Sequence, residues 1–235
     1  MFDALYLSPH LDDAVLSCGA QIWDRVQRGE RVLVATVCAA PPPHREGLSP
    51  FAFSLHQRWN AIGEFDRERE DINAIDRLKA VPHHLNYSDC IYRRAPIGTW
   101  LYQSEEAIFG EVSKHDWSLI AEIAVVLDRI ELNPGAAIFA PRAIGNHVDH
   151  QITRAAGEGW CRARGRPFQY YDDYPYAEAV PGGEEVRVSE EGRRRKIEAI
   201  RAYKSQLSTF WSDEASMIAK VSQWPERTFQ RLEKS

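Results

Sequence analysis

Two short polar clusters hold the side chains whose types and spacing are best suited to chemistry. The first runs from His10 to Asp13 (HLDD) and the second from His147 to His150 (HVDH). In the first turn of a helix, residues three apart share a face, so the two end residues of each cluster can approach one ion together. Imidazole and carboxylate groups suit zinc, and a catalytic zinc site keeps three protein ligands and one position for water. The clusters therefore predict a metal-assisted hydrolase.

The two clusters contain more groups than a catalytic zinc ion needs. If two histidines and one aspartate bind the metal, a carboxylate and an imidazole remain beside the water. A hydrolase needs one group to take a proton from that water and another to stabilise the charged tetrahedral intermediate. The spacing leaves open which of Asp12 and Asp13 is the ligand and which is the base.

Other interpretations of the first cluster account for less of the sequence. An aspartate at a strand-to-helix junction is a common N-cap, and paired acids after a first strand also bind magnesium in phospho-acceptor receiver domains. A receiver-like magnesium switch, however, leaves the HVDH cluster without a role. A noncatalytic nucleotide-binding α/β module would need a Gly-rich turn after the first strand, where residues 9–13 offer charge instead.

The elements that must position the first cluster are a strand and a helix. Residues 5–7 form a short apolar run, and apolar residues from Val15 to Val26 then follow the spacing of a helix. This helix should end near Gly29, and the apolar stretch 31–40 is typical of a fully buried strand. A strand-helix-strand unit implies a parallel sheet. We therefore expect a single Rossmann-like α/β domain over residues 1–235, with helices flanking a mainly parallel sheet.

The second cluster follows the apolar stretch 136–141, which predicts a further strand. Because α/β sheets bind ligands at the carboxyl ends of their strands, the two clusters should share one edge. The Pro-rich stretch 41–57 should be a long irregular surface loop that borders the ligand crevice. The other expected elements are helices at 64–80, 117–130 and 193–211, a helix that starts at Asn146 or Asp149 and runs through Trp160, and a strand at 168–173.

Four tyrosines follow or belong to the expected strand 168–173. They are Tyr170, Tyr171, Tyr174 and Tyr176. Their rings could stack on a sugar, because an apolar face with a polar tip suits a carbohydrate. They could equally be a buried strand followed by a proline turn, and the sequence does not favour either interpretation.

The overall composition argues against several classes of partner. With 29 Lys and Arg against 34 Asp and Glu, the formal net charge is −5 at pH 7, which gives no electrostatic footprint for nucleic acid. No run approaches the roughly 18 apolar residues of a membrane span, and no basic segment with a long apolar stretch opens the sequence. The four cysteines are scattered without a C-x-x-C pair, as is typical of buried thiols. We expect a cytoplasmic protein that acts on a small molecule.

Both clusters resemble the motifs of one enzyme family. The strings SPHLDDAVLSCG and GNHVDHQITRAA are similar to the H-P-D-D-E and H-x-D-H motifs of the LmbE-like, or PIG-L, zinc-dependent N-acetylglucosaminyl deacetylases. The stretch 67–78 resembles the family's R-x-x-E-x-x-x-A-x-x-x-L helix, and Lys196 with the string AYKSQ at 202–206 resembles its K…AYRSQ helix. The resemblance covers nearly the whole chain.

The resemblance implies a metal site and a base. His10, Asp13 and His150 match the family's ligands of Zn²⁺. Asp12 matches the general base that activates the water bound there. The resemblance thus assigns different roles to the two neighbouring aspartates, which spacing alone does not separate.

The resemblance also implies residues that contact the substrate. His147 would face the scissile amide, with Asp149 orienting it and keeping it positively charged enough to stabilise the oxyanion. Arg67 and Asp89 match positions that hold sugar hydroxyls in the family. The implied reaction is hydrolysis of the N-acetyl group of an N-acetylglucosamine-type amino sugar or its conjugate.

The sequence departs from the family pattern at three positions near the site. Leu11 replaces the usual Pro, Ala14 replaces the usual Glu, and Gly145 stands where some members carry a tyrosine that helps to bind the oxyanion. None of these changes removes a metal ligand, but they leave the substrate open. The same zinc site acting on another amide or on a glycosidic bond is the alternative. The family habit of forming trimers or hexamers implies a homo-oligomer.

Overall fold

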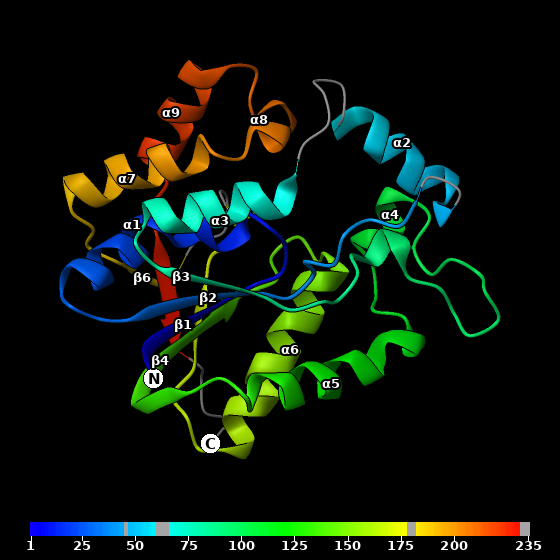
Figure 1. The fold of residues 1–235 in the computed structure, drawn as a ribbon, viewed down its shortest axis with the longest axis horizontal. Helices are drawn as coiled ribbons and strands as arrows, with labels where there is room; N and C mark the ends of the chain where they lie inside the picture. Colours follow the sequence, from blue (N-terminus) through cyan, green and yellow to red (C-terminus); the bar gives the residue numbers. More distant parts are fainter. Residues whose placement is uncertain (45–46, 60–65, 178–181, 231–235) are drawn as a thin grey trace.

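The computed structural model describes residues 1–44, 47–59, 66–177 and 182–230. These residues form one mixed sheet with the strand order β3-β2-β1-β4-β5-β7-β6 (Figure 1). The first five strands in this order run parallel, and β7 and β6 pair antiparallel at one edge. In sheet order the bounds are β3 Val81–His84, β2 Val32–Thr36, β1 Phe2–Ser8, β4 Leu132–Pro141, β5 Gln169–Tyr171, β7 Arg227–Gln230 and β6 Glu184–Glu185. The expected α/β class with a mainly parallel sheet is confirmed.

Helices cover both faces of the sheet (Figure 1). On one face lie α1 (Asp13–Gln27), α3 (Arg67–Arg77), α7 (Glu190–Ile200), α8 (Lys204–Phe210) and α9 (Glu214–Gln223). On the other lie α5 (Trp117–Leu127) and α6 (Val148–Ala163). None of the helices in the described part of the chain is long and apolar enough to cross a membrane.

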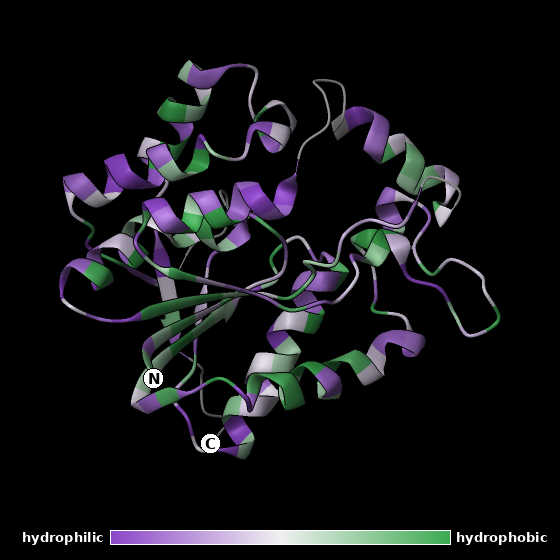
Figure 2. Ribbon diagram, viewed as in Figure 1, coloured by the Kyte–Doolittle hydropathy of each residue, from purple (hydrophilic) through white to green (hydrophobic). Residues whose placement is uncertain are grey.

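Strand β1 shows why the sheet is buried between two layers. Ala4 and Tyr6 belong to the core cluster on the α1 side, whereas Leu5 and Leu7 belong to the cluster on the α6 side. Successive side chains of a strand point to opposite faces of the sheet. Because helices cover both faces, all four side chains are fully buried. Figure 2 shows the strands as largely hydrophobic ribbons between helices with mixed surfaces. A central strand of this kind holds the loop that follows it firmly in place.

A smaller group of elements lies beyond the carboxyl ends of the strands. It consists of α2 (Pro50–Trp59), the short helix η2 (Cys90–Tyr92) and α4 (Glu105–Ile108), which share a third apolar cluster with Val148 of α6. The expectation of an irregular loop over residues 41–57 is wrong from Pro50 onward. Proline is tolerated in the first turn of a helix, because the backbone N–H that it lacks would have no partner there.

The expected helix 193–211 is two helices. Helix α7 ends at Ile200 and α8 begins at Lys204, with a turn between them. The Tyr203 hydroxyl in that turn donates a 2.6 Å hydrogen bond to Asp71 of α3. This tertiary contact breaks an apolar pattern that would otherwise continue as one helix. Helix α9 and strands β6 and β7 were not expected from the sequence.

Candidate metal centre and active site

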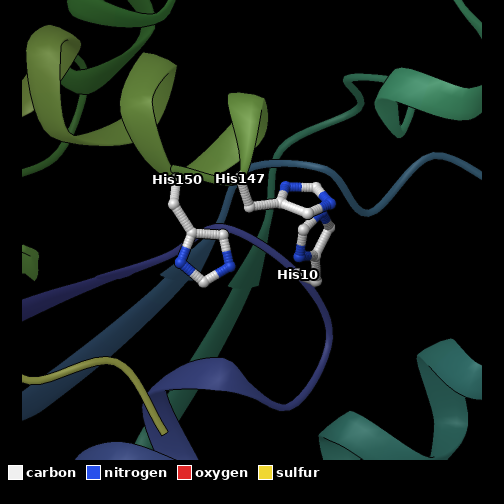
Figure 3. A group of neighbouring side chains, drawn as sticks. All are labelled: His10, His147 and His150. Atoms are coloured by element: carbon white, nitrogen blue, oxygen red, sulfur yellow. The ribbon is translucent and has the colours of Figure 1, made fainter. Parts of the chain in front are cut away.

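The fold brings the two polar clusters together at the carboxyl edge of the sheet. His10 follows β1, and His147 is the N-cap of α6, the helix after β4. Because β1 and β4 are adjacent parallel strands, the loops after them meet. The ring centroids of His10 and His147 are 4.9 Å apart, and that of His150 lies 5.5 Å from His10 and 5.3 Å from His147 (Figure 3). The predicted sharing of one edge is confirmed.

One carboxylate oxygen lies between two of these imidazoles. Asp13 Oδ2 is 3.1 Å from His10 Nδ1 and 3.3 Å from His150 Nε2. Burial disfavours the charge on Asp13, but the two imidazoles outweigh it and hold the pKa of the carboxyl well below its usual range. The ring nitrogens of His10, His147 and His150 also lie within 4.8 Å of one another. Ionised carboxylate and imidazole donors converging in this way fit a divalent metal.

A second aspartate, Asp173, binds the ring nitrogen of His150 that points away from Asp13. The two side chains share a 2.6 Å hydrogen bond between His150 Nδ1 and Asp173 Oδ1, which leaves Nε2 facing Asp13. Burial lowers the pKa of His150, but Asp13 and Asp173 raise it to about 9. Metal-binding histidines are commonly oriented by a carboxylate on their other nitrogen. Sequence reasoning missed Asp173, although its place directly after the strand β5 was a usable signal.

The carboxylate of Asp149 is bound to groups other than the ring of His147. Its carboxylate accepts hydrogen bonds from Arg93 Nη2 and, at 3.0 Å, from the Cys90 backbone N–H, and it lies 3.0 Å from His10 Nε2. Burial raises the pKa of Asp149, but Arg93 and His10 outweigh it and hold the pKa far below its usual range. Asp149 therefore orients His10. Arg93 also was missed from the sequence, because nothing in its neighbours distinguishes it from a surface arginine.

The ring of His147 is hydrogen-bonded to the backbone of Asp149 and not to its carboxylate. Its Nδ1 accepts the Asp149 N–H at 3.3 Å. Burial, followed by the nearby charge of His10, lowers the pKa of His147 to about 3. The structure thus favours a neutral imidazole, whereas the family resemblance implies a charged one. A neutral ring in this place can still donate a hydrogen bond from its Nε2.

Asp12 lies beside this centre with a weaker partner than the other aspartates. Its Oδ2 is 3.7 Å from Arg67 Nη2. Burial and the charge of Asp13 raise the pKa of Asp12 to about 8, although Arg67 lowers it. The backbone of Asp12 has φ 144°, a conformation rarely adopted by residues other than glycine. Strain of this kind and a pKa near neutrality are both frequent at catalytic positions.

The two predicted sugar-binding residues border the same centre. Arg67 opens α3, and its Nη2 lies 3.4 Å from the Leu11 carbonyl oxygen. Asp89 caps η2 and lies 3.8 Å from His10 Nε2. Helix α3 is fixed by Glu70, which accepts hydrogen bonds from the Ser205 hydroxyl at 2.6 Å and its N–H at 3.0 Å. The two helical motifs of the resemblance therefore contact each other and position Arg67.

The chain is similar to proteins that remove acetyl groups. It is 27% identical over 236 residues to 2'-N-acetylparomamine deacetylase of Niallia circulans, covering 90% of this chain and 83% of the relative. It is 28% identical over 183 residues to the enzyme of the same name from Streptomyces fradiae, covering 74% of this chain and 57% of the relative.

A solved structure and a family description agree with these relatives. The zinc-inhibited form of teicoplanin deacetylase superposes with a TM-score of 0.78 at 30% identity, covering 98% of this chain and 99% of that one. The model of the PIG-L family, described as GlcNAc-PI de-N-acetylase, matches residues 5–161 of this chain. That match includes both histidine clusters and most of the sheet. These similarities show that the chain belongs to the PIG-L family and is a hydrolytic N-deacetylase.

Proposed function

We propose that this chain is a zinc-dependent hydrolase that removes the N-acetyl group from an N-acetylglucosamine-type amino sugar or its conjugate. The observation that carries the proposal is the Asp13 carboxylate between His10 and His150, with Asp12 beside it and outside the ligand set. The names of the relatives, which act on N-acetylparomamine and teicoplanin, support an amino-sugar conjugate as the substrate.

The residues present fit a zinc ion. His10, Asp13 and His150 would hold it, because two imidazoles and one carboxylate are a common ligand set of catalytic zinc. Asp149 and Asp173 orient the two imidazoles through their other ring nitrogens. When bound, zinc would polarise the amide carbonyl and lower the pKa of a water molecule.

The other side chains of the site transfer protons, stabilise the oxyanion and bind the sugar. Asp12 accepts a proton from the attacking water and later gives one to the leaving amine, as the C–N bond breaks and acetate forms. His147 donates a hydrogen bond to the oxyanion of the tetrahedral intermediate. Arg67 and Asp89 bind sugar hydroxyls at the border of the site. Asp12 and His147 are both buried.

Three further properties accompany the proposal. We place the reaction in the cytoplasm and assign it to one domain over residues 1–235. We also expect a homo-oligomer, either a trimer or a hexamer, which analytical ultracentrifugation would measure. The partner of the site is a small amino-sugar molecule.

The proposal is tested by acetate release from a panel of N-acetylated amino sugars. The panel includes N-acetylglucosamine conjugates, N-acetylparomamine and an N-acetylated glycopeptide. The protein is stripped with a chelator and reloaded with one equivalent of zinc, since a relative has a zinc-inhibited form. We expect zinc-dependent release of acetate and free amine in equal amounts from at least one compound. Release of a reducing sugar without acetate would instead support the glycosidic alternative, and no product at all would contradict the proposal.

A further inference from the structure

Two aromatic rings lie directly against the histidines of the site. The ring of Phe109 contacts that of His147 edge to face, with centroids 5.3 Å apart. The ring of Tyr176 meets His150 in the same way at 5.9 Å, and Phe109 and Tyr176 contact each other at 5.7 Å. We call Phe109 and Tyr176 the aromatic wall. Both are partly exposed, whereas the two histidines are buried, so the wall is a partly exposed apolar surface beside the histidines.

Hydrogen bonds to two neighbours of His150 hold the segments that carry the aromatic wall. Gln151, which follows His150 in α6, donates a 2.8 Å hydrogen bond to the carbonyl of Gly110, next to Phe109. The carbonyl of Asp173, whose side chain orients His150, accepts the N–H of Ala177 at 3.0 Å, next to Tyr176. Both rings therefore keep a defined distance from the imidazoles.

Gly145 allows Tyr176 to approach the centre. A Cβ atom at Gly145 would lie 3.1 Å from the Tyr176 ring, which is tighter than ordinary van der Waals contact. The φ of Gly145 is +86°, a conformation in which side chains are strained. The absence of a side chain at Gly145 leaves room for the ring of Tyr176.

The two polar side chains at the border of the site each lie close to one of its central residues. Arg67 approaches Asp12, and Asp89 approaches His10. An N-acylated sugar likewise has one polar end and one apolar end, joined at the amide. The polar end suits Arg67 and Asp89, and the apolar acyl chain suits aromatic carbon.

We propose that the aromatic wall receives the acyl group of the substrate and that Phe109 limits the length of the acyl chain that is hydrolysed. This inference rests on the proposed function, because it assumes that an N-acyl sugar is the substrate. Because the two rings contact each other and the histidines, an acyl chain bound against them would meet aromatic carbon as it lengthens. Removal of one ring would leave room for a longer chain.

Hydrolysis of a chain-length series tests the inference. The substrates are the N-acetyl, N-propanoyl, N-butanoyl and N-hexanoyl derivatives of one amino sugar, and kcat/KM is measured by amine release. One methylene in an apolar pocket discriminates by about 10- to 200-fold. Phe109→Ala should therefore raise the butanoyl-to-acetyl ratio of kcat/KM by about 10-fold or more. Tyr176→Ala should shift the ratio in the same direction, whereas the matched control Tyr176→Phe keeps the ring and should keep the wild-type ratio.

Binding of acyl hydroxamates to the zinc-loaded protein gives a readout without turnover. In calorimetry, Phe109→Ala should bind the hexanoyl hydroxamate more tightly relative to the acetyl compound than the wild type does. Unchanged ratios in Phe109→Ala and Tyr176→Ala, with zinc content retained, would overturn the inference. If the wild type hydrolyses none of the amides, the proposed function fails, and the hydroxamate series alone then decides whether the wall selects chain length.

Discussion

At the scale of single residues, the roles of the aspartates follow from their partners. Asp13 lies between two imidazoles, Asp149 is paired with Arg93, and Asp173 is bound to His150. Among the described residues, the nearest cation to Asp12 is Arg67 at 3.7 Å. Their partners hold the pKa values of Asp13 and Asp149 below the usual range, whereas the pKa of Asp12 is raised to about 8. A group whose pKa lies near neutrality is the one able to exchange protons during a reaction.

Substitution of Asp173 should weaken metal binding without touching a ligand. Asp173→Asn removes the charge that orients His150, and loss of such a partner costs about 10- to 100-fold in metal affinity. Competition with a chelator of known affinity measures the effect. The matched control is Asp172→Asn, because the neighbouring Asp172 pairs with Arg142 and not with a histidine of the site. Equal zinc affinity in Asp173→Asn and wild type would contradict the role given to Asp173.

His84 predicts a pH-dependent contribution to stability outside the site. Its Nε2 is 2.7 Å from Asp71 Oδ2, and its Nδ1 is 3.6 Å from Glu68. Burial lowers the pKa of His84, but Asp71 and Glu68 outweigh it and raise the pKa above 6.5. Because the pKa is raised in the folded state, the stabilisation is fully present below pH 6.5 and is lost as the pH rises through the folded value.

The measurement is urea unfolding of His84→Gln and wild type at pH 5.5 and at pH 8.5. The difference in the free energy of unfolding should be larger at pH 5.5. A difference that is the same at both pH values would show that the ion pair does not contribute.

At the scale of elements, close packing of α6 against the sheet fixes the histidines. A Cβ atom at Gly157 would lie 2.6 Å from Leu7 Cδ1 in β1 and 3.1 Å from Phe168. Both neighbours are buried, so neither can move freely away. The absence of a side chain at Gly157 thus lets the helix that carries His150 lie directly on the strand that precedes His10.

Two glycines of α6 form a matched pair for testing this contact. Gly157→Ala should lower the free energy of unfolding by about 1–3 kcal/mol, because it overpacks the core. Gly159→Ala adds a methyl group where nothing lies within 4 Å, and should stabilise the protein by up to about 1 kcal/mol through helix propensity. Thermal and denaturant unfolding measure both. If the two substitutions had the same effect, the close approach of α6 to β1 would be refuted.

Elements with a strong local pattern were predictable, and those fixed by distant contacts were not. The short apolar run of β1, the spacing of α1 and the buried stretch of β2 were all visible in the sequence. The break between α7 and α8 depends on Tyr203 reaching Asp71, and α2 begins at a proline that suggested a loop. Strand β7 pairs antiparallel with β5 across a long stretch of chain, and short strands of this kind have little pattern of their own.

The candidate site shows the same division. His10, Asp13, His147 and His150 could be placed together from sequence, because adjacent parallel strands bring their following loops to one edge. Arg93 and Asp173 act through contacts with residues far away in the chain. Such partners are set by the fold as a whole. The place of Asp173 after β5 was a signal in the sequence, but its pairing with His150 became visible only in the structure.

At the scale of the whole molecule, the buried carboxylate of Glu226 joins the C-terminal part of the chain to helices α1 and α7. Glu226 accepts hydrogen bonds from the backbone N–H groups of Ala20 and Gln21 in α1, at 2.9 and 2.8 Å. Lys196 of α7 donates to the same carboxylate at 2.9 Å, and both side chains are 2% exposed. Helix α1 begins at Asp13, which is a proposed metal ligand. The contacts of Glu226 therefore stabilise the helix that carries this ligand.

The central claim assigns metal binding to Asp13 and proton transfer to Asp12. It is tested most directly by measuring bound zinc and the rate of acetate release in the same preparations of Asp12→Asn and Asp13→Asn. We predict that Asp12→Asn keeps about one zinc per chain and loses about 10²- to 10⁴-fold in rate, because an amide cannot accept the proton of the water. Asp13→Asn should lose both zinc and rate. An Asp12→Asn protein without zinc beside an Asp13→Asn protein that retains it would contradict the account.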